Sequence, residues 1–162
     1  MPNSIRLNRG RTSLKEVFQK ASRLGASKVL VLFTRKGNPS VLFLFTASGE
    51  LLQFLMISGV KLSVDMKVTR QEIESKLRNV NTYCLAESDC PLISQFLINL
   101  GYKLGDNCDV IARAKAESDI CVVNFFHKGS ILIPPEIRFL NDKGNTEIYK
   151  WGVSLISEVV KG

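Results

Sequence analysis

The sequence predicts an α/β protein with mixed sheets (α+β), arranged as two tandem halves of about 1–65 and 66–162. Two observations support this class. A strand, a helix and further strands follow one another in the first part of the chain, and the same order returns in the second part. Runs of β-branched and aromatic residues also alternate with stretches whose apolar residues recur at helical spacing. Because 162 residues is a typical length for one domain, we expect both halves to belong to a single domain, 1–162.

The first half begins with a predicted short strand at 4–8, where two apolar residues alternate with polar ones. An amphipathic helix is expected over 13–24, because its apolar residues recur at steps of three and four. Ser13 and Glu16 have the spacing of a capping box at the start of this helix. Three apolar strands separated by turn-forming residues follow at 27–34, 41–45 and 51–57.

The second half contains two predicted helices among its strands. One helix is expected from Thr69 to Asn79, where Glu72 completes another capping-box spacing. The other is expected to be capped by Asp89 and to end at Gly101. Strands are predicted at 82–86, 110–113, 120–126, 131–133, 137–140 and 146–151, with a hairpin turn at 141–145, whereas 152–160 fits either a helix or a strand.

Positive charge is concentrated near the amino terminus. The whole chain carries a formal net charge of +7, but residues 1–40 contain nine basic side chains and one acid, Glu16. The other residues are close to neutral, so the asymmetry favours a polyanionic partner. A solvated basic face without a partner is the alternative. Apolar runs of at most five residues exclude a membrane-spanning helix, no secretory signal is visible at the start, and we expect a cytoplasmic protein.

The sequence shows no catalytic or metal-binding signature. It lacks a nucleotide P-loop and a nucleophile elbow, so we expect a non-enzyme with no catalytic residues, no metal and no cofactor. The four cysteines lack the close pairing of zinc ligands, and we expect them to be small buried apolar side chains. A Cys–His nucleophile using His127, or a hidden hydrolase site, remains an alternative. A disulfide would matter only in a protein from a hyperthermophile.

The segment from Ile5 to Arg11 is the most informative part of the chain. Arginine side chains can contact phosphates bidentately, a glycine lets the backbone approach a ligand closely, and the amides of 12–14 at a helix start can donate to an anion. The turn at 35–38 would supply a second cationic tip. The alternative is an ordinary strand–helix turn with solvent-facing arginines. We expect phosphate contacts from Arg6, Arg9 and Arg11 around Gly10, a base or sugar contact from Asn8, and a flank formed by Lys15, Arg35 and Lys36.

Three motifs in this region also resemble those of the Brix-domain ribosome-biogenesis proteins. They are Pro2-Asn3-Ser4-x-Arg6-x-Asn8-Arg9-Gly10, then Ser13-Leu14-Lys15-Glu16, then Lys36-Gly37-Asn38-Pro39. The sequence resembles the short archaeal members, which have a single Brix domain. The resemblance is specific over about residues 2–60. It implies two halves, each similar to the anticodon-binding domain of class IIa aminoacyl-tRNA synthetases.

The sequence departs from the family pattern at two places. Members usually have a strand and a helix before the Pro-Asn-Ser segment, whereas Met1 directly precedes Pro2 here, so the first half is expected to lack that initial strand–helix unit. The segment 47–50 also replaces the Pro-x-Gly-Pro-Thr pattern of many eukaryotic members.

The resemblance implies a non-catalytic rRNA-binding assembly factor that acts in ribosome biogenesis and pre-rRNA processing. Its expected partners are ribosomal RNA or its precursor and other ribosome-assembly proteins, with no membrane. The alternative is a protein–protein interaction module within a ribonucleoprotein complex, in which the basic patch is incidental. The oligomeric state stays open.

Overall fold

The computed structural model describes residues 4–140, which form three helices and eight strands. The strands are arranged in the order β1-β2-β3-β8-β7-β6-β4-β5. The predicted mixed α+β class is therefore confirmed. In chain order the elements are α1 (Leu14–Arg23), β1 (Lys28–Arg35), β2 (Asn38–Thr46), β3 (Leu51–Lys61), α2 (Arg70–Leu77), β4 (Tyr83–Ser88), α3 (Pro91–Asn99), β5 (Lys103–Leu104), β6 (Val110–Glu117), β7 (Ile120–His127) and β8 (Ile131–Leu140).

The contacts divide the chain into two compact units within β3. Residues 5–56 belong to one unit, and residues 57–140 belong to the other. The amino-terminal part of β3 pairs with β2, whereas its carboxyl-terminal part pairs with β8.

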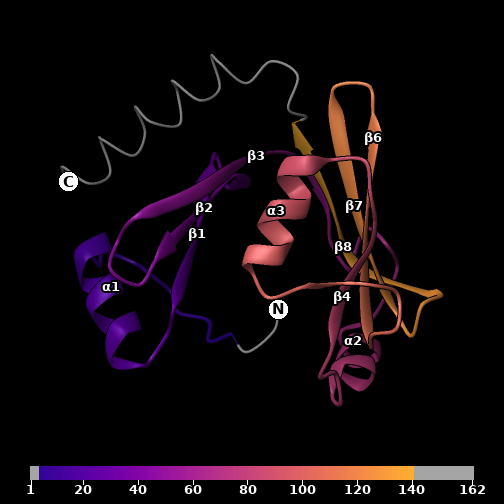
Figure 1. Cartoon of the computed structure of the whole chain (residues 1–162), viewed down its shortest axis with the longest axis horizontal. Coiled ribbons are helices and arrows are strands. Elements are labelled where there is room, and N and C mark those ends of the chain that lie inside the picture. The colour runs from indigo at the N-terminus through magenta and orange to yellow at the C-terminus, as the bar shows by residue number, and fades with distance from the viewer. Residues whose placement is uncertain (1–3, 141–162) are drawn as a thin grey trace. The chain divides into compact units, whose positions relative to one another are not determined.

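The first unit (residues 5–56) packs α1 against one face of the antiparallel strands β1, β2 and β3 (Figure 1). Alternate residues of a strand point to the same face, so the odd-numbered positions of β1 and β2 form one apolar surface. The helix contributes the buried Ala21 and the partly buried Val17 and Phe18 to it. The predicted helix and three strands are confirmed here, each within a few residues of its expected bounds. One buried core cluster of this unit consists of Ala21, Val29, Val41, Phe43 and Phe45.

The second unit (residues 57–140) contains an antiparallel run of β3, β8, β7 and β6, next to which β4 and β5 pair in parallel. Helix α3 buries Ile93, Phe96 and Leu97 and begins at Pro91, where a missing amide proton costs nothing. Helix α2 has the predicted capping box between Thr69 and Glu72.

The structure corrects the element predictions at several places. Residues 4–8 form no strand, since Ile5 and Leu7 are 70% and 43% exposed and no ladder partner is present in the described part of the chain. The predicted strands 131–133 and 137–140 are one strand, β8. Its proline pair lies where the register against β7 shifts, which is where a strand tolerates proline. The short strand β5 was not predicted. The predicted elements between 141 and 160 lie outside the described residues.

The cysteines are not the four separate apolar side chains that we expected. Cys84 is disulfide-bonded to Cys108, and Cys90 is bonded to Cys121. Cys90 is also the N-cap residue of α3 in place of the expected Asp89, and it makes no side-chain capping hydrogen bond. The second bridge therefore fixes the start of α3 to β7. Sequence spacing missed both pairs because their partners are 24 and 31 residues apart.

Candidate nucleic-acid interface

A tight turn connects the amino-terminal segment to α1. The amide of Thr12 donates to the carbonyl of Arg9 at 2.9 Å, and Nε of Arg9 donates to the carbonyl of Thr12 at the same distance. Gly10 has φ +55°, a left-handed conformation that costs other residues about 1–2 kcal/mol. A Cβ there would meet nothing within 4 Å, so the backbone conformation, and not space, requires glycine at this position.

The side chain of Arg9 connects this turn to β1. Its guanidinium carbon lies 5.8 Å from the centroid of the Phe33 ring, which is within the range of a cation–π contact. Phe33 itself packs edge-on against Phe43 in the core of the first unit. Arg9 is therefore only partly exposed, and it has a structural role in addition to the predicted phosphate contact.

The predicted second cationic tip lies next to this contact. Arg35 follows Phe33 by two residues and ends β1, where it pairs with Asn38 across the β1–β2 turn. Lys36 and Gly37 form that turn with φ +51° and +80°. Because α1 and β1 are joined by a short connection and contact each other, the start of α1 lies at the same end of the unit as this turn.

The structure thus brings together most, but not all, of the predicted site. Arg9, Gly10 and Arg11 share the first turn, Lys15 lies in the first helical turn, and Arg35 and Lys36 form the neighbouring tip. Arg6 and Asn8 are exposed on the irregular segment before the turn, and neither forms a hydrogen bond or ion pair within the described part of the chain. We refer to the group Arg6, Asn8, Arg9, Gly10, Arg11, Lys15, Arg35 and Lys36 as the basic turn patch.

Among residues 4–140, no ion pair joins a cation of the basic turn patch to an acid. The ion pairs recorded within residues 4–140 join Lys61 and Arg138 to Glu136, and Arg70 to Glu74, all outside the patch. Its cationic side chains are exposed, apart from the partly exposed Arg9. The positive charge therefore faces solvent and is available to a polyanion.

The start of α1 offers fewer free amides than the sequence suggested. The amide of Thr12 is used by the turn, and the amide of Ser13 donates to the Glu16 carboxylate at 3.4 Å. The amide of Glu16 donates to the Ser13 hydroxyl, which completes the capping box. Of the amides of 12–14, that leaves Leu14 for an anion, so arginine and lysine side chains must provide most of the contacts.

The structure provides no support for the nucleophile alternative. All four cysteines are bonded in pairs, so no thiol is available to His127. Within residues 4–140, no three histidine, cysteine or acidic side chains gather as metal ligands would. In the same range, no helix has the length and apolar character needed to cross a lipid bilayer.

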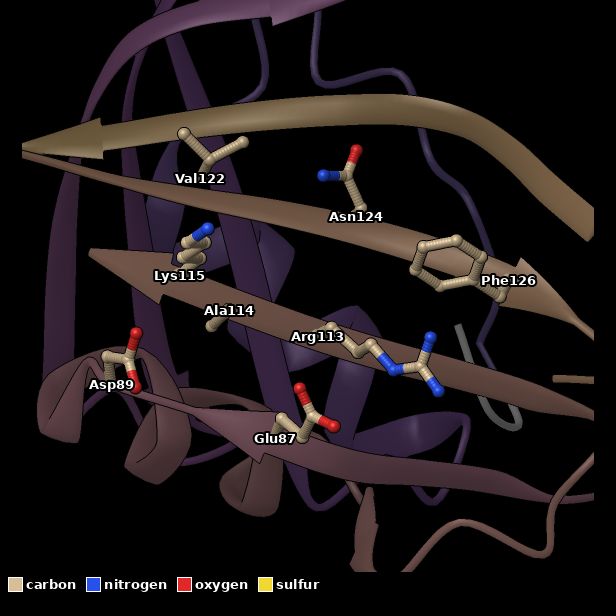
Figure 2. A pocket seen from close by; sticks show the side chains of 8 residues that line it. All are labelled: Glu87, Asp89, Arg113, Ala114, Lys115, Val122, Asn124 and Phe126. Atoms are coloured by element: carbon tan, nitrogen blue, oxygen red, sulfur yellow. The ribbon is translucent and has the colours of Figure 1, made fainter. Parts of the chain in front are cut away.

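A pocket in the second unit was missed by the sequence analysis. It has a volume of about 340 Å³ and lies over β4, β6 and β7 (Figure 2). Strand register places Glu87, Arg113 and Asn124 side by side, and the Arg113 guanidinium carbon is 4.9 Å from the Phe126 ring centroid. The sequence predicted strands at 82–86, 110–113 and 120–126 but no site on them. The available signal was a pair of basic residues two positions apart, Arg113 and Lys115, which must lie on the same face of their strand. The strand register that places Asn124 beside Arg113 cannot be predicted from the sequence.

Comparison with known proteins identifies similar archaeal sequences. One, described as a "Probable Brix domain-containing ribosomal biogenesis protein" from Saccharolobus solfataricus, is 28% identical over 143 residues, which cover 86% of this chain and 79% of that protein. Another with the same description, from Sulfurisphaera tokodaii, is 30% identical over 142 residues, which cover 85% and 77%. No protein-family model matches the chain.

Two solved structures share the fold. The crystal structure of a probable ribosomal biogenesis protein from Aeropyrum pernix K1 aligns with a TM-score of 0.65 at 18% identity, covering 87% of this chain and 82% of that one. The structure of Mil, an archaeal Imp4-like protein, aligns with a TM-score of 0.56 at 20% identity, covering 83% and 77%. At these identities the likeness is one of fold alone.

Proposed function

Because this chain belongs to the Brix domain-containing ribosomal biogenesis proteins, we propose that it serves ribosome biogenesis as a non-catalytic assembly factor that binds ribosomal RNA or its precursor. The basic turn patch is the proposed RNA contact. Other ribosome-assembly proteins are further proposed partners.

The observation that carries this proposal is the arrangement of mostly exposed cations at one end of the first unit, none of them in an ion pair within residues 4–140. Arg9 over Phe33 holds the first turn next to the tip that bears Arg35 and Lys36. Two cationic loops at one end can contact successive phosphates of one strand. Arginine is suited to this role because its planar guanidinium forms two parallel hydrogen bonds with a phosphate.

The chemistry of the patch favours backbone contacts over the recognition of bases. Apart from Asn8, the contacting side chains are cations, which neutralise phosphates without reading sequence. Phe33 contacts Arg9 of the patch, but it is partly buried and also packs against Phe43. Stacking of bases on this ring is therefore not part of the proposal.

The domain organisation is part of the same proposal. Residues 1–162 would form one Brix-like domain with halves of about 1–65 and 66–162, each similar to the anticodon-binding domain of class IIa aminoacyl-tRNA synthetases. Support comes from the helix packed on strands in each unit, α1 in the first and α3 in the second.

Titration of the full chain with a structured rRNA fragment over a series of salt concentrations tests the proposal. The logarithm of the association constant should fall linearly with the logarithm of salt, with a slope of about −0.7 to −0.9 per phosphate contacted. The triple variant Arg6→Ala, Arg11→Ala, Arg35→Ala should bind at least tenfold more weakly and with a shallower slope.

The matched control removes three exposed cations of the second unit: Arg78→Ala, Lys103→Ala and Lys128→Ala. It should change affinity much less. Salt-independent affinity, or equal losses in both triple variants, would contradict the proposal and favour a protein–protein module.

A further inference from the structure

The pocket over β4, β6 and β7 has the composition of a small-ligand site. Strand register places Glu87 opposite Arg113 and Arg113 opposite Asn124, so three polar side chains from three strands share one face of the sheet. Lys115 and Phe126 lie on the same face, next to them. Figure 2 shows the side chains of Glu87, Arg113 and Asn124 around one space, with the Phe126 ring beside the guanidinium. The volume of about 340 Å³ is within the range of small-molecule sites.

Arg113 is oriented by the ring and lacks an acceptor. Its Cζ lies 4.9 Å from the Phe126 centroid, and its buried Nε–H has no hydrogen-bond partner among residues 4–140. Glu87 is opposite it in register, but no ion pair within 4 Å joins the two in that range. A buried donor without a partner destabilises the fold, and a bound ligand that accepts from it would remove that destabilisation.

We propose that this pocket binds one unpaired nucleotide of RNA and prefers guanine. A guanidinium fixed against an aromatic ring presents its donors in one defined plane, which suits hydrogen bonds to the acceptors at a base edge. The ammonium of Lys115 would contact the phosphate of the same nucleotide. The inference rests on the proposed RNA-binding function, and it adds a base-reading site in the second unit to the mainly phosphate contacts of the basic turn patch.

The preference for guanine follows from the hydrogen-bonding groups in the pocket. Glu87 accepts through two carboxylate oxygens, and the Watson–Crick edge of guanine carries two adjacent donors, N1–H and N2–H. Adenine, cytosine and uracil each present an acceptor next to a donor on that edge, which would meet the carboxylate unfavourably. Guanine O6 and N7 are acceptors, as the donors of Arg113 and Asn124 require.

Short single-stranded RNAs that differ at one base test the preference in the full chain. Fluorescence anisotropy should show U3-G-U3 bound roughly tenfold more tightly than U3-A-U3 or U7. Glu87→Gln replaces one acceptor oxygen by a donor amide and should abolish this ratio. The control Glu117→Gln changes an exposed acid of the same sheet outside the pocket and should preserve it.

Free GMP tests the pocket independently of the basic turn patch. In the wild-type chain, the NMR signals of the Arg113 Nε–H and the Asn124 side-chain amide should shift on addition of GMP and shift much less with CMP or UMP. Phe126→Leu should weaken the GMP response, while circular dichroism confirms that the fold is retained.

The outcomes separate this inference from the proposed function. Equal affinity for the guanine and adenine oligonucleotides, or no GMP shifts at Arg113 and Asn124, overturns the pocket proposal even where salt-dependent RNA binding is intact. GMP shifts without salt-dependent rRNA binding support the pocket and contradict the role of the basic turn patch. A ratio that survives Glu87→Gln also overturns the assignment, because guanine would then be read elsewhere or by a bound contaminant.

Discussion

Arg9 lies over the ring of Phe33, with its guanidinium carbon 5.8 Å from the ring centroid. The same side chain donates through Nε to the carbonyl of Thr12. One arginine therefore connects the amino-terminal turn to the strand that ends at Arg35. This contact holds the two cationic loops of the basic turn patch at one end of the first unit.

Replacing Phe33 by leucine should weaken RNA binding without removing any charge. The variant loses the cation–π contact, worth about 0.5–1 kcal/mol at an exposed site, so the turn is held less firmly. Phe54→Leu is the matched control, since Phe54 also packs against Phe43 in the core. Denaturant unfolding should show similar losses of stability for both variants, whereas only Phe33→Leu should lower affinity for rRNA. Equal affinities in the two variants would contradict the linking role of Arg9.

Replacing Glu16 by glutamine should strengthen RNA binding. Glu16 is the one acid in residues 1–40, and its carboxylate closes the capping box of α1 beside the patch. Glutamine keeps the capping hydrogen bond but loses the favourable charge at the helix start, so stability should fall by only about 0.3–1 kcal/mol while the local charge becomes more positive. Glu72→Gln makes the same change in the capping box of α2 and should leave RNA affinity unchanged. Salt titrations of both variants measure the difference. An equal gain in RNA affinity in Glu72→Gln would contradict a local effect at the patch, because it would show that affinity depends only on the net charge of the chain.

The elements that could be predicted from sequence are those with a local physical cause. The two capping boxes, at Ser13 and Thr69, were located correctly because the hydrogen bonds that define them join residues three apart. The apolar runs of β1 and β2 were likewise found because β-branched and aromatic residues favour strands, although β1 is less buried than its apolar run suggested, with Leu32 51% exposed. The strand at 4–8 failed because alternation of two apolar residues does not supply a partner strand.

The parts that could not be predicted depend on contacts between distant residues. The disulfides join cysteines that are 24 and 31 residues apart. The pocket around Arg113 requires the register of three strands, and the Arg9–Phe33 contact requires the packing of the turn against β1. The cationic residues of the patch were identifiable from composition, but their grouping at one end of the unit was not.

Removing the bridge between Cys90 and Cys121 should destabilise the second unit. The bridge closes a long loop and fixes the start of α3 to β7, and native bridges of this kind contribute about 2–4 kcal/mol. The double variant Cys90→Ala, Cys121→Ala should therefore unfold at lower denaturant concentration. RNA affinity of the basic turn patch should persist at temperatures where the variant is folded, because the patch lies in residues 5–56. Equal stability of wild type and variant would contradict the role given to the bridge.

Stability should fall on the acid side because of Asp109. Backbone and side-chain hydrogen bonds from Asn81 and Thr82 hold the pKa of the Asp109 carboxyl below its ordinary value. A carboxyl with a lowered pKa stabilises the fold at pH values above its unfolded pKa, about 4, and the contribution is lost as pH falls through the folded value. Thermal melts over this range should fall less steeply for Asp109→Asn than for the wild type.

Asp119→Asn, in the exposed turn between β6 and β7, is the control for this titration. Its melting temperatures should follow the wild-type pH dependence. An unchanged slope for Asp109→Asn would show that these hydrogen bonds do not favour the charged form in solution.

The most direct measurement of the central claim is photocrosslinking of the full chain to a bound rRNA fragment, with the attached peptides identified by mass spectrometry. The account predicts crosslinked peptides from residues 4–15 and from the tip at 34–38, and their loss when salt is raised. Crosslinks that occur only elsewhere in the chain, under conditions where the RNA is fully bound, would contradict the claim that the basic turn patch holds the RNA backbone.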